Sequence, residues 1–168
     1  YNLAGALHEI NEFDASIQSY QTALFIEPDY AEAHNNLGNV LKEIGQLDKA
    51  IESYEKAVAL KPDYIEAYYS LGDSFYEVGK LEDTIKCYKR VIEYRPNFTG
   101  MHNNLGNIFR ELERFDEAVL SYEKAISIDT GFVEGYYNLG ITLQELKQLD
   151  NALVNYKKAI KIKPNYPE

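Results

Sequence analysis

Polar side chains recur along this chain at multiples of 34 residues, and their types suit hydrogen bonding rather than covalent chemistry. Asn36 returns as Asn104, and Asn39 returns as Asn107. A side-chain amide offers both donors and acceptors, so a row of amides can pair with the backbone of an extended peptide whatever the side chains of that peptide. These residues therefore point to recognition of a peptide backbone.

The amides belong to a larger set of candidate ligand-binding positions. With Ala31 counted as repeat position 1, positions 5, 6 and 9 carry amides, tyrosines, a serine and an aspartate. Repeat position 13 is a glutamate in every repeat, so we expect an acidic margin that favours a neutral or basic extended segment. The predicted peptide-binding residues are Asn35, Asn36, Asn39, Tyr69, Ser70, Asp73, Asn103, Asn104, Asn107, Tyr137 and Asn138.

Residue types that support catalysis or metal binding are present, but their spacing does not suit either role. His34 and His102 lie two repeats apart, without a cysteine or second histidine at ligand spacing. His8 and Glu9 begin a string like HExxH that has no second histidine. We therefore expect no catalytic residues, no metal and no cofactor, and we expect that the protein is not an enzyme.

Composition limits the class of partner. The formal net charge is -10, and phosphate binding depends largely on Lys and Arg, so we expect no nucleic-acid partner. No apolar run approaches the roughly 20 residues of a membrane span, so we expect no membrane partner. A protein or peptide partner remains. We expect a cytoplasmic location, and we expect a fragment of a longer protein because the chain begins at Tyr1 without a methionine.

Repeats determine which elements position these residues. The string HNNLGN at 34–39 returns at 102–107, and SYEKA at 53–57 returns at 121–125. A fixed period of this kind is the signature of a repeat architecture. We expect a single solenoid over residues 1–168, built from a partial repeat and four full ones. The expected repeats are 1–30, 31–64, 65–98, 99–132 and 133–166.

Each repeat is expected to form two helices. In the second repeat, apolar residues recur at helical spacing over residues 31 to about 44 and again over residues 47 to about 60. Gly45 and Gly79 suit the left-handed residue that ends a helix. Glu113 and Lys147 adopt that conformation less readily, so we expect those two turns to differ.

Small residues are expected where the paired helices approach each other. Glycine occupies position 8 of each full repeat, and alanines such as Ala50 and Ala118 are expected to face it. One hairpin cannot bury both of its apolar faces, so neighbouring repeats must cover the remainder. The terminal hairpins lack such a neighbour, and we expect that these uncapped ends allow self-association.

The eight spaced residues of the second repeat resemble the pattern of the tetratricopeptide repeat (TPR) family. They are His34, Leu37, Gly38, Leu41, Ala50, Tyr54, Ala57 and Pro62. The resemblance covers the whole chain and implies an all-α, helix-turn-helix solenoid coiled into a right-handed superhelix. It also implies a concave groove lined by the first helix of each repeat, and a role as a protein-interaction scaffold. His34 and His102 occupy the aromatic packing position of the family, which implies a place in the core.

The family resemblance leaves two functions open. The amides resemble the asparagine ladder in the TPR arm of O-linked N-acetylglucosamine transferase, so an alternative is the substrate-recruiting arm of a larger enzyme such as a glycosyltransferase. The family's carboxylate clamp, which holds acidic C-termini, is not expected. Its lysine at position 5 is replaced here by Asn35 and Asn103.

Overall fold

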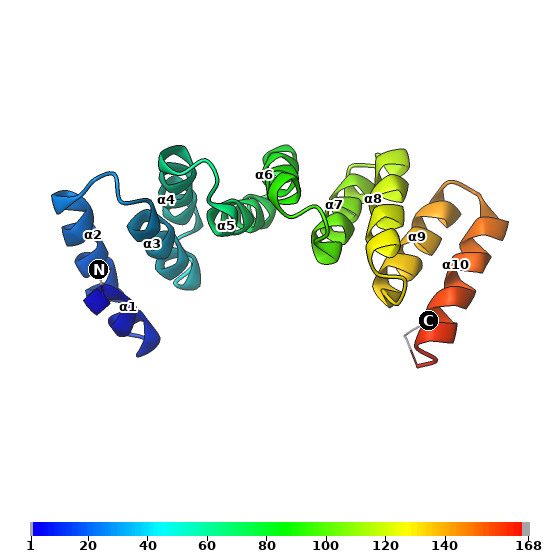
Figure 1. Ribbon diagram of the computed structural model, residues 1–168, viewed down its shortest axis with the longest axis horizontal. Helices are drawn as coiled ribbons and strands as arrows, with labels where there is room; N and C mark the ends of the chain where they lie inside the picture. The colour runs from blue at the N-terminus through cyan, green and yellow to red at the C-terminus, as the bar shows by residue number, and fades with distance from the viewer. Residues whose placement is uncertain (1, 166–168) are drawn as a thin grey trace. The chain divides into compact units, whose positions relative to one another are not determined.

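The computed structural model describes residues 2–165, and over this range it contains ten α-helices and no strand (Figure 1). The predicted all-α repeat fold is confirmed. The helices are α1 (Asn2–Glu9), α2 (Phe13–Ile26), α3 (Ala31–Glu43), α4 (Leu47–Leu60), α5 (Ile65–Glu77), α6 (Leu81–Tyr94), α7 (Thr99–Glu111), α8 (Phe115–Ile128), α9 (Val133–Glu145) and α10 (Leu149–Ile162).

Consecutive helices pack as hairpins, each made of one odd-numbered and one even-numbered helix (Figure 1). In the second repeat, α3 and α4 reproduce the predicted helices to within one residue. Within a packed unit, the second helix of a hairpin also contacts the first helix of the next, as α4 contacts α5. We therefore call the odd-numbered helices A helices and the even-numbered ones B helices.

The chain divides into two compact units. Unit 1 contains α1 to α6 and ends at Tyr94, and unit 2 begins at Arg95 and contains α7 to α10. Each unit has its own buried residues, with Leu37, Val40 and Tyr54 in unit 1 and Leu105 and Tyr122 in unit 2. The single solenoid over residues 1–168 stays a prediction.

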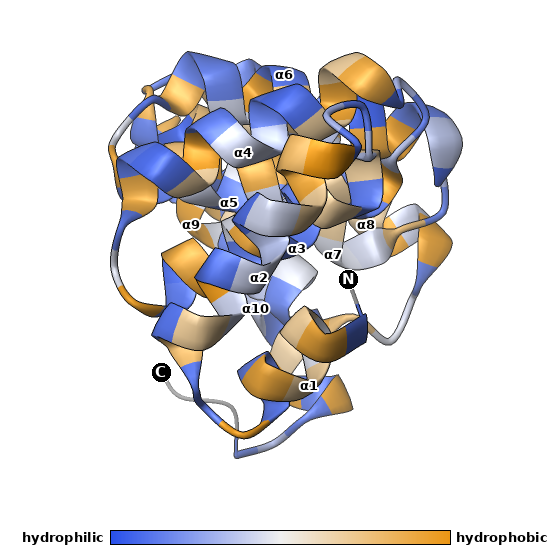
Figure 2. Ribbon diagram, turned by 90° about the vertical axis from the view of Figure 1, so that its left-hand side faces the viewer, coloured by the Kyte–Doolittle hydropathy of each residue, from blue (hydrophilic) through white to orange (hydrophobic). Residues whose placement is uncertain are grey.

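Hydrophobic and hydrophilic residues alternate along the helices, as the orange and blue bands in Figure 2 show. On α3, the residues at positions 3, 7, 10 and 11 are Ala33, Leu37, Val40 and Leu41, and none is more than 7% exposed. This spacing matches the 3.6-residue helical period. On α3, the charged residues Glu32, Lys42 and Glu43 lie outside this buried stripe.

The turns between A and B helices are alike in all five repeats, which corrects the expectation for Glu113 and Lys147. Asn11, Gly45, Gly79, Glu113 and Lys147 have φ values of 63°, 75°, 75°, 56° and 60°. Backbone hydrogen bonds explain the uniformity. The residue after each left-handed one donates back across the turn in all five repeats, at distances of 2.8 or 2.9 Å. These bonds impose the left-handed conformation even on a glutamate and a lysine.

Glycine in place of Glu113 or Lys147 should stabilise the protein, because both residues have a positive φ. A left-handed conformation costs a non-glycine residue about 1–2 kcal/mol, and glycine loses about 0.5–1 kcal/mol more backbone entropy on folding than alanine. We expect Glu113→Gly and Lys147→Gly each to raise the free energy of unfolding by about 0.5–1 kcal/mol, measured by urea denaturation. Gly45→Ala is the matched control and should lower it. No change in either direction would mean that these turns carry no backbone strain.

The glycines at position 8 of the full repeats lie directly against tyrosine rings of the B helices. A Cβ atom added to Gly38 would lie 2.6 Å from Cε1 of Tyr54, and one added to Gly106 would lie 2.5 Å from Cε1 of Tyr122. Ala50 and Ala118 are fully buried, but they are not among the nearest atoms to these glycines. The missing side chain therefore leaves room for the aromatic ring of the B helix.

Candidate peptide-binding site

The tyrosine that lies against each glycine reaches the polar arc of the A helix with its hydroxyl. The hydroxyl of Tyr54 donates to Oδ1 of Asn39 at 2.8 Å, and that of Tyr122 donates to Oδ1 of Asn107 at 2.8 Å. Burial raises the pKa of Tyr122 to about 12, so its hydroxyl is protonated at neutral pH and acts as a donor. Tertiary packing of the B helix thus determines the orientation of the amide at position 9.

This orientation determines what the position-9 amides offer to a ligand. Because the oxygens of Asn39 and Asn107 accept hydrogen bonds from the tyrosines, their Nδ2 groups supply the remaining donors. Both residues are half-buried. A peptide carbonyl is the natural partner of such a group.

Position 9 is not an amide in the other two full repeats. In the third repeat it is Asp73, which accepts from the hydroxyl of Tyr88 at 2.5 Å. In the fifth it is Ile141, and the hydroxyl of Tyr156 donates instead to Oε1 of Gln144 at 3.0 Å. The A helices therefore present a donor, an anion, a donor and an apolar side chain in turn.

In unit 2, two predicted ligand-binding amides join successive repeats. Asn103 is 2% exposed and Asn138 is 8% exposed. Nδ2 of Asn138 donates to Oδ1 of Asn103 at 3.0 Å and to Oδ1 of Asn107 at 3.2 Å. Nδ2 of Asn103 donates to Oε1 of Glu134 at 2.8 Å. These amides were expected on an open face, but the neighbouring A helix covers them.

The corresponding junction in unit 1, where α3 contacts α5, lacks this chain of hydrogen-bonded amides. Asn35 is 6% exposed, and its Nδ2 donates to Oδ1 of Asn36 at 3.2 Å. Its Oδ1 is buried without a hydrogen-bond partner among the described residues. Ser70 stands where unit 2 has Asn138, and its shorter side chain carries no amide donor. The buried oxygen of Asn35 therefore has no counterpart of the Asn138 donor.

Tyrosine pairs accompany α5 and α9. The rings of Tyr69 and Tyr88 are stacked, with centroids 6.3 Å apart, and those of Tyr137 and Tyr156 are 6.0 Å apart. Burial raises the pKa of Asp73, although the hydrogen bond from Tyr88 and the positive charge of Lys42 oppose that rise. The negative charge of Asp73 in turn raises the pKa of Tyr69. The carboxylate is thus partly desolvated beside half-buried Tyr69.

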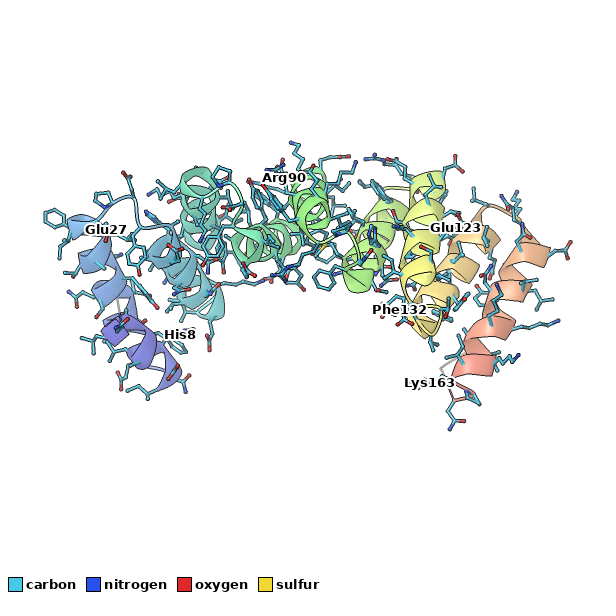
Figure 3. All side chains as sticks on the ribbon, in the orientation of Figure 1. His8, Glu27, Arg90, Glu123, Phe132 and Lys163 are labelled. Carbon is cyan, nitrogen blue, oxygen red and sulfur yellow. The ribbon has the colours of Figure 1, made fainter. Side chains whose placement is uncertain are left out.

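Two of the position-13 glutamates contact a basic side chain of the preceding repeat. Nε2 of His8, labelled on α1 in Figure 3, lies 2.7 Å from Oε2 of Glu43. Nζ of Lys42 lies 2.9 Å from Oε1 of Glu77. Exposed pairs of this kind contribute about 0–1 kcal/mol to stability. The ammonium group of Lys42 also neutralises part of the acidic margin that the sequence predicts.

The two position-4 histidines have a structural role, which confirms their predicted place in the core. His34 and His102 are each 8% exposed. Their Nε2 atoms lie 2.8 Å from the Pro28 carbonyl oxygen and 2.9 Å from the Pro96 carbonyl oxygen, respectively. Each histidine therefore ties its A helix to the preceding loop.

The thiol of Cys87 and the carboxylate and histidine side chains are of the types that form reactive and metal-binding sites. Burial raises the pKa of the Cys87 thiol to about 12. Among the described residues, no three His, Cys, Asp or Glu side chains gather closely enough to hold a metal ion. Within residues 2–165, none of the helices has the length and apolar character that crossing a membrane requires.

Each unit also contains a cleft that the sequence did not reveal. In unit 1 a cleft of about 750 Å³ lies between α2 and α4, above Leu37 and Leu41 of α3. In unit 2 a cleft of about 740 Å³ lies between α8 and α10, above Leu139 and Leu143 of α9. Among the predicted ligand-binding residues, none lines either cleft. The clefts depend on the spacing of successive B helices, which no local sequence pattern encodes.

The fold and the site define a helical-hairpin repeat protein whose A helices present hydrogen-bonding side chains. Models of the TPR repeat match residues 5–45, 38–79, 72–109 and 106–147, and a tetratricopeptide repeat model matches residues 133–166. The chain belongs to the tetratricopeptide repeat family.

Solved structures give the same fold. The crystal structure of MamA is 28% identical, has a TM-score of 0.89, and covers 98% of this chain and 96% of its own. The crystal structure of YrrB, described as a TPR protein with an unusual peptide-binding site, is 25% identical with a TM-score of 0.87. The match covers 98% of this chain and 85% of the YrrB chain. MamA from Desulfovibrio magneticus RS-1 shares the fold, with 15% identity and a TM-score of 0.84. That match covers 99% of this chain and 94% of the MamA chain. No curated protein sequence matches this chain significantly.

Proposed function

We propose that this protein is an interaction scaffold that binds an extended peptide segment along its A helices. The observation that carries the proposal is the orientation of Asn39 and Asn107. Each amide oxygen accepts a tyrosine hydrogen bond at 2.8 Å, which leaves the Nδ2 donors for a ligand. Donors held in place before binding lose little conformational entropy when the ligand arrives. Backbone carbonyls of an extended segment offer acceptors regardless of its sequence.

Similarity supports the same role. YrrB shares 25% of its residues with this chain and is described as having an unusual peptide-binding site. The half-buried residues Asn36 and Asn104 stay predicted ligand contacts beside the position-9 amides. Buried Asn35, Asn103 and Asn138 act in this proposal as supports of the repeat junctions rather than as ligand contacts.

The decisive test converts the position-9 donors into acceptors without disturbing the tyrosines. Asn39→Asp and Asn107→Asp keep an oxygen for the hydroxyls of Tyr54 and Tyr122, as Asp73 does for Tyr88 in the third repeat. A peptide array should first yield a neutral peptide that binds the parent protein. The double variant should bind that peptide about 1–3 kcal/mol more weakly in calorimetric titration, because two hydrogen bonds to the ligand are lost.

A control separates this effect from misfolding. The double variant should retain its helical circular dichroism spectrum, since the hydrogen bonds from the tyrosines remain. If a folded double variant binds the neutral peptide as tightly as the parent does, the peptide does not pair with the position-9 amides. If no peptide on the array binds, the proposed function itself is wrong.

A further inference from the structure

The molecule contains two nearly identical junctions between A helices, one in each unit. The α3–α5 junction combines HNNLGN with YYSLGD, and the α7–α9 junction combines HNNLGN with YYNLGI. Within these strings the two junctions differ only at Ser70 against Asn138 and at Asp73 against Ile141. Each junction therefore serves as a reference for the other.

At the α7–α9 junction, the side-chain oxygens of Asn103 and Asn107 both accept hydrogen bonds from within the junction. Oδ1 of Asn103 accepts from Asn138, and Oδ1 of Asn107 accepts from both Asn138 and Tyr122. At position 9 of α9, Ile141 adds no polar group. This junction offers a ligand no unpaired buried oxygen among the described amides and no carboxylate at position 9.

The α3–α5 junction has an excess of acceptors. Oδ1 of Asn35 is buried without a donor, because Ser70 replaces the longer amide. An unsatisfied buried carbonyl is destabilising, and its negative dipole end adds to the local potential. Asp73 contributes a half-buried carboxylate in which one oxygen accepts from Tyr88 at 2.5 Å.

The α3–α5 junction is also more negative in formal charge than the α7–α9 junction. Around α5, the carboxylates of Asp73 and Glu77 are accompanied by one cation, Lys42, whose Nζ lies 2.9 Å from Glu77. The corresponding positions of unit 2 hold Arg110, Ile141 and Glu145, which balance in charge. One negative charge is therefore left over at the α3–α5 junction.

An aromatic side chain lies beside that charge. Tyr69 is half-buried and stacks on Tyr88 with ring centroids 6.3 Å apart. Asp73 accepts a hydrogen bond from the hydroxyl of the same Tyr88, so Tyr88 contacts both the carboxylate and the ring of Tyr69. A carboxylate next to a tyrosine ring suits a cation, because the ion pair and the cation–π attraction act together.

We propose that the α3–α5 junction is a subsite for a lysine or arginine side chain of the bound segment, with Asp73 and Tyr69 as its contacts. The inference rests on the proposed peptide-binding function and specifies the side chain that one part of the site selects. The buried oxygen of Asn35, which has no donor, belongs to the same junction. The α7–α9 junction, which carries Ile141 at position 9, has no such preference.

The test is an arginine scan of the neutral dodecapeptide that the array selects. Each position is replaced in turn by arginine or by citrulline, which has nearly the same shape without the charge. At one position, arginine should bind roughly tenfold more tightly than citrulline. Asp73→Asn, which keeps an acceptor for Tyr88, should remove that preference while leaving the citrulline peptide bound as before.

A gain-of-function variant provides an independent measurement. Asn138→Ser combined with Ile141→Asp gives unit 2 the residues of the α3–α5 junction, and a second arginine-selective peptide position should appear. If arginine and citrulline bind equally at every position of the parent, the cation subsite is wrong while peptide binding stands. If arginine selectivity survives Asp73→Asn, another group binds the cation and the assignment fails. Absence of any bound peptide would overturn both proposals.

Discussion

Gly106→Ala is expected to lower the free energy of unfolding by about 2–3 kcal/mol, although alanine is the better helix former by about 1 kcal/mol. The added Cβ would lie 2.5 Å from Cε1 and 2.7 Å from Cδ1 of Tyr122. The ring is fully buried, and Asn107 accepts a hydrogen bond from its hydroxyl, so it cannot move away freely. Overpacking of this kind costs about 1–3 kcal/mol, and displacement of the ring would also weaken the hydrogen bond.

The matched control lies on the same helix. A Cβ added to Gly100 would meet its nearest atom, Cε2 of Phe98, at 3.5 Å, which is an ordinary contact. Gly100→Ala should therefore be neutral or stabilising, within about 1 kcal/mol. Urea denaturation of both variants measures the difference. Equal stabilities would show that the position-8 glycine provides no necessary space for the tyrosine.

Gly106→Ala also connects stability with binding. If the ring of Tyr122 is displaced, Asn107 loses the hydrogen bond that orients its amide. A folded variant should then bind a neutral peptide more weakly, even though residue 106 contacts no ligand in our proposal. The glycine, the tyrosine and the position-9 amide thus form one positioning system in each repeat that contains all three.

The helices could be predicted from sequence because their determinants are local. Apolar residues at helical spacing, a short turn and a proline after the B helix define α3 and α4 to within one residue. The fixed 34-residue step then extends this prediction to the other repeats. The position-4 histidines were also assigned correctly to the core, since the repeat register alone determines their place.

The predictions from sequence that were wrong concern contacts between elements. At Glu113 and Lys147, propensity predicted different turns, but the hydrogen bonds that end the A helices impose the same left-handed geometry. At Asn103 and Asn138, the helical wheel of a single helix predicted exposure. Their burial depends on the A helix of the neighbouring repeat, which lies 35 residues away in the sequence. A pattern within one repeat contains no information about that contact.

Asn138→Ala is expected to lower the free energy of unfolding by about 2–3 kcal/mol, because the side chain joins α9 to α7 through two hydrogen bonds. Its loss would leave Oδ1 of Asn103 buried without a donor, at a cost of about 1–3 kcal/mol, and would also leave a small cavity. Ser70→Ala is the matched control. Oδ1 of Asn35 has no donor in the parent junction, so this change should cost less than about 1 kcal/mol.

A double-mutant cycle identifies the source of the effect. Asn103→Ala and Asn138→Ala should couple by about 0.5–3 kcal/mol. Either substitution alone already breaks the hydrogen bond between the two amides, so the second substitution does not lose it again. The measurement is urea denaturation of the four proteins in the cycle. Strict additivity would mean that the two amides contribute separately, and equal costs for Ser70→Ala and Asn138→Ala would remove the distinction between the two junctions. Strong coupling between Asn103 and Asn138 would support the difference in hydrogen bonding on which the cation subsite at α3–α5 depends.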